Sequence, residues 1–221
     1  MKKINYYYVR HGRTEYNDQG RMQGWCDSPL TESGIQDAYR TKELLKDVPF
    51  RYAYSSSLPR CVTTIGIIME GRDVEIRYSD KLKETNFGDL EAKVIKDHYE
   101  DVDYRRKVTL DWSDIGGENM EMEAKRVREI YQEIYDACDD GDNVLVVSHG
   151  AVYLHMLNFM LHIDMRDYVD KVAVQANGHA VPNGFVGVFS YDGKEYTLES
   201  IYGQDANLIK NLKKLTFSSN N

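Results

Sequence analysis

The chain has 221 residues, 42% of them hydrophobic, and a formal net charge of −8 at pH 7. This length can bury one sizeable core, so we predict a single domain over residues 1–221 that carries insertions. The negative charge argues against a general nucleic-acid binder, which needs a basic surface, and no stretch approaches the roughly 18 apolar residues of a membrane span. We therefore expect partners that are neither nucleic acid nor membrane.

The cysteines and the N-terminus indicate the compartment. Cys26, Cys61 and Cys138 are odd in number, widely spaced and without a C-x-x-C pair, which fits a reducing compartment better than a disulfide framework or a structural zinc site. The N-terminus has two lysines but no apolar signal region. We expect a cytoplasmic protein, and the sequence does not specify its oligomeric state.

Two apolar runs in the chain end in a His-Gly pair. The first starts near Tyr6 and ends with Arg10 and His11, and the second starts at Val144 and ends with His149. Both patterns are typical of buried strands. Ligands of an open α/β sheet bind outside the carboxyl ends of its strands. If the two strands are parallel neighbours, the two histidines meet at one site.

The rest of the chain alternates between helix and strand patterns. This alternation predicts a three-layer α/β/α fold with a mainly parallel central sheet, and Asp192-Gly193 predicts a hairpin that forms an antiparallel edge. Residues 92–115 are charged, aromatic and poorly periodic, so we expect an insertion or lid with short helices. The other expected strands are residues 51–56, 74–78, 172–176, 184–191 and 196–202. The expected helices are residues 31–46 with Thr31 as N-cap, 59–69, 116–138 and 151–161.

The residue types at the strand ends favour phosphoryl transfer. A neutral imidazole such as His11 is a good nucleophile near pH 7, and the guanidinium groups of Arg10 and Arg60 match phosphate oxygens. With His149 they would form a cationic cup, and Glu84 could protonate the leaving oxygen and then take a proton from water. Nearby acidic alternatives to Glu84 are Asp89, Glu91 and Glu118. Backbone donors could come from the helix N-termini after Gly12, Pro59 and Gly150.

Six sequence blocks resemble those of the histidine phosphatase superfamily, the phosphoglycerate mutase-like proteins, in the family's order. The resemblance spans roughly residues 4–190 and goes well beyond a lone Arg-His-Gly. The blocks are residues 10–17 (RHGRTEYN), 20–31 (GRMQGWCDSPLT), 56–64 (SSLPRCVTT), 82–91 (LKETNFGDLE), 116–118 (GGE) and 148–150 (SHG).

The resemblance implies a role for each matching residue. His11 would be the nucleophile that forms a phosphohistidine, Arg10 and Arg60 would hold the phosphoryl oxygens, His149 would stabilise charge on the transferring group, and Glu84 would donate and accept the proton. The family needs no metal, and we expect no cofactor. The residues that match phosphate-pocket positions are Thr14, Asn17, Gln23, Gly24 and Gly150, the last supplying backbone donors.

Departures from the family pattern bear on the reaction. Mutases of the cofactor-dependent type carry Arg-His-Tyr-Gly after the glutamate and a proline-rich insertion, whereas here residues 85–88 read Thr-Asn-Phe-Gly and residues 108–115 contain no proline. These differences favour a phosphatase. Ala92 stands where many relatives carry glycine.

The leading expectation is a metal-independent phosphomonoester hydrolase of a small phosphorylated metabolite. The alternatives are a 2,3-bisphosphoglycerate-dependent phosphoglycerate mutase and, in another class, a non-catalytic phosphate-sensing or interaction protein. A metal-dependent hydrolase on His11, His149 and His155 is a fourth hypothesis, although His155 fits a partly buried helix face better, since no carboxylate or cysteine falls at ligand spacing.

The charged insertion offers two hints about the substrate. One set of side chains could bind a second anionic group, and another could cover an apolar or sugar moiety, although a solvated lid face explains both as well. The first set is Arg105, Arg106 and Lys107. The second set is Tyr99, Tyr104 and Trp112.

Overall fold

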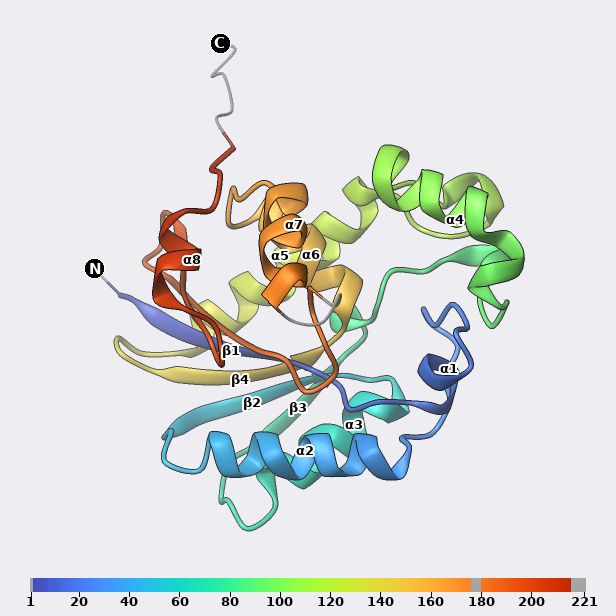
Figure 1. Cartoon of the computed structure of the whole chain (residues 1–221). Coiled ribbons are helices and arrows are strands. Elements are labelled where there is room, and N and C mark those ends of the chain that lie inside the picture. The colour runs from blue at the N-terminus through green and yellow to red at the C-terminus, as the bar shows by residue number, and fades with distance from the viewer. Residues whose placement is uncertain (1, 176–179, 216–221) are drawn as a thin grey trace.

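The computed structural model describes residues 2–175 and 180–215, and in this part of the chain six strands form one sheet in the order β3-β2-β4-β1-β5-β6 (Figure 1). The strands are β1 (Ile4–Arg10), β2 (Phe50–Ser56), β3 (Ile76–Ser79), β4 (Asn143–Ser148), β5 (Val186–Tyr191) and β6 (Tyr196–Ile201). The helices are α1 (Glu15–Asp18), α2 (Glu32–Leu44), α3 (Pro59–Met69), α4 (Tyr99–Tyr104), α5 (Met120–Ala137), α6 (Gly150–Phe159), α7 (Met165–Gln175) and α8 (Ala206–Lys210).

The sheet is mainly parallel, with an antiparallel edge, as the sequence predicts. Strands β1, β2, β3 and β4 pair in parallel, whereas β5 runs antiparallel to both β1 and β6. Arg10 at the end of β1 pairs in register with Ser148 at the end of β4. The residues that follow these two, His11 and His149, are therefore neighbours at the carboxyl edge of the sheet.

Helices cover both faces of the sheet, so the predicted three-layer architecture is confirmed. Alternate residues of β4 separate the two cores: Val144 and Val146 pack with α5, α6 and α7, while Leu145 and Val147 pack with α3. Figure 1 shows α2 and α3 on one side of the sheet and α5, α6 and α7 on the other. Burial on both faces explains why the parallel strands read as continuous apolar runs.

Local signals fix where two of these helices begin. The Thr31 side chain accepts a hydrogen bond from the backbone N–H of Gly34, which makes Thr31 the N-cap of α2, as expected. Pro59 occupies the first turn of α3, where its missing N–H costs nothing. Arg60 is thereby placed in the first turn of α3, close to the sheet edge.

One predicted strand is wrong. Residues 172–175 belong to α7 rather than to a strand, and Ala176 lies outside the described residues. Tyr168 and Val172, four residues apart, are both buried, so the apolar spacing follows a helical period that five residues alone do not reveal. The third strand begins at Ile76 rather than at residue 74.

The segment 92–115 forms short helices, as expected, and packs on a small apolar cluster beside the sheet edge. It contains α4 and a π-helical turn over Arg105–Thr109. The cluster is made of Met22, Phe87, Leu90, Val102 and Trp112. Within the described ranges, no helix combines the length and the apolar character that crossing a bilayer requires.

Candidate active site

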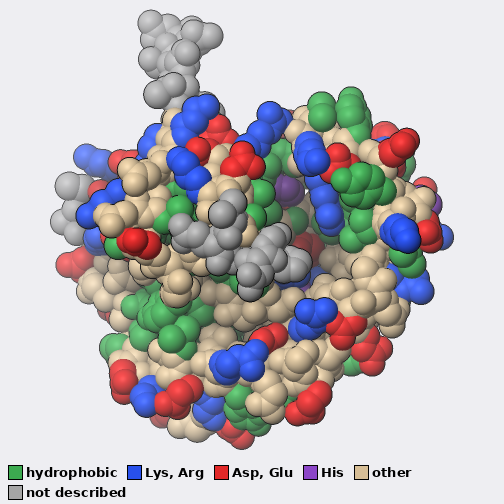
Figure 2. Space-filling model, in the orientation of Figure 1, with side chains coloured by type: hydrophobic (Ala, Val, Ile, Leu, Met, Phe, Trp, Pro, Cys, Tyr) green, Lys and Arg blue, Asp and Glu red, His purple; other side chains and the backbone are tan. Residues whose placement is uncertain are grey.

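A cavity of about 1510 Å³ opens at the carboxyl edge of the sheet, next to His11. Figure 2 shows this face hollowed near its centre, with basic side chains and a histidine visible at the hollow. The predicted site residues that line the cavity are Arg10, His11, Asn17, Gln23, Glu84 and Gly150. The predicted residues that lie outside this lining are Thr14, Gly24, Arg60 and His149.

Hydrogen bonds fix the protonation pattern of the His11 ring. Nδ1 lies 2.8 Å from the carbonyl oxygen of Gly12, which can only accept, so Nδ1 carries the proton. Nε2 accepts from Nε of Arg60 at 3.3 Å. Burial, followed by the charges of Arg60 and Arg10, holds the pKa of His11 well below its usual range. His11 is therefore a neutral imidazole with its lone pair on Nε2, the form that a nucleophilic histidine needs.

Gly12 and Gly34 allow the backbone that follows His11 to pack closely against the start of α2. A Cβ on Gly12 would lie 2.2 Å from the carbonyl oxygen of Gly34, and a Cβ on Gly34 would lie 2.0 Å from that of Arg13. The backbone N–H of Gly12 also donates to Thr64 Oγ1 at 3.1 Å. Only glycine permits this contact between the His11 loop and the start of α2.

Arg60 connects the two histidines. Its Nη2 donates to His149 Nδ1 at 3.1 Å and to the carbonyl oxygen of Gly24 at 2.7 Å, while Nε donates to His11. Its Nη1 pairs with Asp27 at 2.8 Å. The side chain is fully buried. This residue, which is predicted to bind an anion, is thus anchored behind His11, with its Nε directed at Nε2 of the His11 ring.

His149 lies behind Arg60 rather than on the cavity wall. Since Arg60 can only donate, Nδ1 of His149 is unprotonated, and Nε2 donates to Ser56 Oγ at 2.8 Å. Burial and the charge of Arg60 hold the pKa of His149 well below its usual range. The rings of His11 and His149 lie 5.3 Å apart. The two predicted histidines do meet, but both nitrogens of His149 are bound by protein groups.

Arg10 presents a donor without a protein partner. Its Nη1 donates to the carbonyl oxygen of Val181 at 2.6 Å, while its buried Nε has no partner in the described part of the chain. A Cβ on Gly150 would come within 3.2 Å of this Nε, so the glycine leaves room for the arginine. An unpaired buried donor on a cavity wall is ready to bind an anion.

Glu84 is held by the first turn of α6. Its carboxylate accepts from the backbone N–H groups of Thr85 at 3.0 Å, Ala151 at 3.1 Å and Val152 at 3.1 Å. The expectation that the donors after Gly150 face phosphoryl oxygens is therefore wrong for Ala151 and Val152, because both bind this side chain.

The acidic alternatives to Glu84 lie outside the cavity lining. Glu91 accepts from the backbone N–H groups of Trp25 and Cys26, and Glu118 pairs with Arg126. Of the four acidic candidates, Glu84 alone lines the cavity.

Three of the other predicted pocket residues, Thr14, Asn17 and Gln23, are joined by hydrogen bonds. Thr14 caps α1 through the N–H of Asn17 and donates from its hydroxyl to Gln23 at 2.6 Å. Asn17 and Gln23 reach the cavity, whereas Thr14 is buried behind them. Gly24 permits close packing, because a Cβ there would lie 2.4 Å from Oε1 of Glu91.

Three residues that support the site were missed at the sequence level. Asp27 and Ser56, which bind Arg60 and His149, stand inside the family-like blocks, but their partners are far away in sequence. Asn183 donates to the carbonyl oxygen of His11 at 3.1 Å and to Asn17 at 3.2 Å. A separation of 172 residues between Asn183 and His11 left no sequence signal for that contact.

Two of the three basic residues that the sequence suggested as anion ligands in the insertion reach the cavity. Arg106 and Lys107 line the cavity, but Arg105 is bound to Asp101 and Asp114 outside it. The prediction that Arg105 binds substrate is wrong, because two carboxylates already hold its guanidinium.

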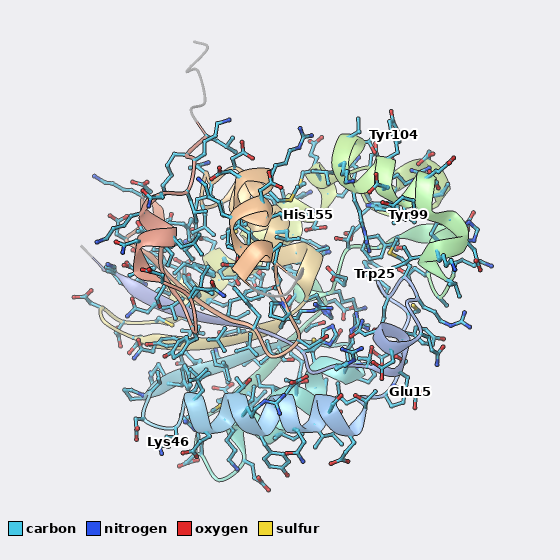
Figure 3. The ribbon with its side chains drawn as sticks, in the orientation of Figure 1. Glu15, Trp25, Lys46, Tyr99, Tyr104 and His155 are labelled. Carbon is cyan, nitrogen blue, oxygen red and sulfur yellow. The ribbon has the colours of Figure 1, made fainter. Side chains whose placement is uncertain are left out.

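The aromatic residues of the insertion do not cover the cavity. Trp112 is buried against Phe87, with ring centroids 4.9 Å apart. Tyr99 and Tyr104 are exposed on α4 and lie outside the cavity lining (Figure 3). The expectation that these three side chains cover an apolar or sugar moiety is therefore wrong.

The metal hypothesis finds no support in the described residues, which contain no group of three side chains suited to hold a metal ion. His155, the suggested third ligand, pairs instead with Glu123.

Comparisons with known proteins identify the family. The family model of the histidine phosphatase superfamily (branch 1) matches residues 6–201. A 2,3-bisphosphoglycerate-dependent phosphoglycerate mutase 2 of Gloeobacter violaceus is 32% identical over 185 residues, covering 80% of this chain and 83% of that protein. An adenosylcobalamin/alpha-ribazole phosphatase of Salmonella typhimurium is 36% identical over 148 residues, covering 65% and 73%. The solved structure of YhfR from Bacillus stearothermophilus aligns with a TM-score of 0.72 at 27% identity, covering 93% and 99%. The chain is therefore an enzyme that belongs to the histidine phosphatase superfamily.

Proposed function

We propose that the protein is a metal-independent phosphomonoester hydrolase that acts on a small phosphorylated metabolite through a phosphohistidine on His11. One observation carries the proposal: His11 is buried and neutral, its proton is held on Nδ1 by Gly12, and its Nε2 lone pair lies against Arg60. A lone pair and a fixed positive charge at one point suit attack on phosphorus.

The reaction has two steps. In the first, Nε2 of His11 attacks phosphorus, the ester P–O bond breaks, and the Glu84 carboxyl group gives a proton to the leaving oxygen. In the second, the Glu84 carboxylate takes a proton from water while the water oxygen attacks phosphorus, which breaks the N–P bond. Inorganic phosphate leaves, and His11 and the Glu84 carboxyl group return to their starting forms.

Each supporting residue has a role that follows from its contacts. Arg10 offers its unpaired Nε to a phosphoryl oxygen, and the positive charge of Arg60 behind His11 helps to neutralise the phosphoryl group. His149 positions the Arg60 guanidinium through Nδ1 and is itself oriented by Ser56. Arg106 lines the cavity without a carboxylate in ion-pair distance among the described residues, so a substrate anion is its natural partner.

A phosphoglycerate mutase is the second candidate, because a mutase relative matches 80% of the chain. The Thr-Asn-Phe-Gly run after Glu84 and the proline-free insertion favour the phosphatase. The free cysteines support a reducing location such as the cytoplasm.

Two assays on one preparation separate these candidates. The first measures phosphate release from a panel of small phosphomonoesters with a chelator present. The second measures conversion of 3-phosphoglycerate to 2-phosphoglycerate with 2,3-bisphosphoglycerate added. Release that survives the chelator and vanishes in His11→Ala supports the phosphatase, whereas isomerisation faster than release supports the mutase. Activity in neither assay would contradict both candidates.

The phosphohistidine is tested separately by rapid quenching with a ³²P-labelled substrate. We expect an acid-labile, base-stable label on the wild-type protein and none on His11→Ala. Turnover without this label would contradict the covalent step.

A further inference from the structure

His155 lies on the wall of the same cavity, although no step of the proposed reaction uses it. It stands on α6, one turn beyond Ala151, and only 7% of the residue is exposed. Figure 3 shows its position on α6 above the sheet edge, facing the gap toward the 92–115 segment. The sequence suggested only a partly buried helix face, so its place on the cavity wall calls for an explanation.

A buried carboxylate holds this ring. Nδ1 of His155 lies 3.0 Å from Oε1 of Glu123, which is 1% exposed, and Oε2 of Glu123 accepts from the Thr85 hydroxyl at 2.6 Å. Burial acts to lower the pKa of His155, but the Glu123 carboxylate outweighs it and Glu84 adds to the effect, so the pKa is raised. Arg126 acts in the opposite direction.

The second ring nitrogen has no assigned partner. With Nδ1 bound to Glu123, Nε2 lies on the opposite side of the ring, and no group in the described ranges forms a hydrogen bond with it. A charged imidazole donates from both nitrogens, so one N–H remains unused beside the cavity. This N–H is not shut off from solvent, so an anionic group in the cavity can reach it.

Structural stabilisation alone does not account for the pair. The desolvation of two buried charges often cancels their attraction, and apolar residues of similar volume can replace such a pair without loss of stability. A charged pair that presents one donor to a substrate cavity is better explained by recognition.

We propose that His155, held by Glu123, binds an anionic oxygen on the leaving portion of the substrate, so that the preferred substrates are phosphomonoesters with a second anionic group. The inference rests on the proposed phosphatase function and names its substrate class. His155 acts as a specificity residue, and Glu123 is a positioning residue that keeps it charged and oriented.

Three probe substrates on a three-carbon skeleton test the proposal. Glycerol 3-phosphate has no second anion, 3-phosphoglycerate carries a carboxylate, and propane-1,3-diol bisphosphate carries a second phosphate. We expect His155→Gln to lower kcat/KM at least tenfold for one or both probes that carry a second anionic group, mainly through KM, and to change the value for glycerol 3-phosphate less than twofold. The probe that responds identifies the anion.

The controls separate recognition from folding. Glu123→Gln should reduce the same preference, because the ring loses the charge that holds it. His98→Gln makes the same chemical change on an exposed residue outside the cavity lining and should leave all three values unchanged. If His155→Gln fails to fold with Glu123 left unpaired, the double variant Glu123→Gln/His155→Leu removes both charges and gives the same comparison.

Binding to the His11→Ala variant, measured by calorimetry, keeps the two proposals distinguishable. If the wild-type protein releases phosphate from no probe and from no ester of the panel, but the variant binds the probes with a second anionic group more tightly in a His155-dependent way, the hydrolase fails and the anion site stands. Equal losses for all three probes in His155→Gln, or no change for any, would overturn the anion site.

Discussion

Nε of Arg60 lies 3.3 Å from Nε2 of His11, and the same guanidinium donates to Nδ1 of His149 at 3.1 Å. One buried arginine thus sets the orientation of both rings, and Asp27 holds its far end at 2.8 Å. Through these contacts, the ends of β1 and β4, which carry the two histidines, are tied to a single side chain from α3.

Replacing Arg60 tests this arrangement. We expect Arg60→Ala to lower kcat by about 10²–10³-fold, by analogy with the loss of one preorganised donor. Arg77→Ala, which removes a half-exposed arginine paired with Glu75 away from the cavity, should leave kcat within a factor of two. Steady-state rates, with the melting temperature of each variant measured alongside, check the prediction. A near-normal rate in Arg60→Ala would remove Arg60 from the reaction.

The neutral histidines predict how stability depends on pH. Folding lowers the pKa of both His11 and His149 below the ordinary value of 6.5. Below pH 6.5, these two histidines therefore bind protons in the unfolded chain but not in the folded chain. The free energy of unfolding should therefore fall as the pH drops from 7 through 6. His155, whose pKa is raised, contributes with the opposite sign, because its stabilisation is lost as the pH rises through its folded value.

Urea denaturation at pH 7.0, 6.5, 6.0 and 5.5 measures this dependence. His11→Asn removes one of the two groups, so its unfolding free energy should fall less steeply over this range than that of the wild type. Parallel curves for the two proteins would show that His11 is not held neutral by the fold.

The contact between Gly12 and Gly34 predicts an effect that combines stability and activity. A Cβ on Gly34 would lie 2.0 Å from the Arg13 carbonyl oxygen, so Gly34→Ala must displace the backbone that carries His11. We expect a loss of about 1–3 kcal/mol in the free energy of unfolding, as for other overpacked sites, together with a lower kcat. Denaturant melts and steady-state rates on the same samples measure both effects.

Gly66 provides the matched control for that substitution. It lies in the middle of α3 with no atom near its missing Cβ, so Gly66→Ala should raise stability by up to about 1 kcal/mol and leave kcat unchanged. Equal responses of Gly34→Ala and Gly66→Ala would show that the close contact does not constrain the chain.

Ala92 adopts a φ of 62°, the left-handed region that disfavours side chains. It stands where many relatives carry glycine, so the backbone here keeps a conformation that favours glycine although the residue is alanine. Ala92→Gly should raise the free energy of unfolding by about 1 kcal/mol, and Ala92→Val should lower it. The urea midpoints of the three proteins check this order, and a destabilised Ala92→Gly would contradict it.

The sequence predicted the parts of the site that lie next to their own strand or helix. His11, Arg10 and His149 follow buried apolar runs, and Arg60 follows a proline that starts a helix, so local patterns place them. The parallel pairing of β1 and β4 then brings the two histidines together. These relationships were predictable because each depends on a short stretch of chain.

The parts that the sequence could not give depend on distant partners. Glu123 and His155 are 32 residues apart, and neither has a neighbour in sequence that indicates an ion pair. Arg105 and Arg106 are adjacent and of the same type, and both lie in one π-helical turn. Nevertheless, Arg106 lines the cavity, whereas Arg105 pairs with Asp114 outside it. The apolar spacing around Val172 fitted a strand and a helix equally over so few residues.

The first turn of α6 holds Glu84, and His155 stands four residues beyond Ala151 on the same helix. At about 1.5 Å of rise per residue, that separation is about 6 Å along one rigid rod. In the proposed reaction, this helix therefore fixes the distance between Glu84, as the proton donor, and His155, as the residue that binds the second anion. A related enzyme could therefore accept substrates with a different distance between the phosphate and the second anion if its histidine lay one turn earlier or later on this helix. The residues around His11 would not need to change.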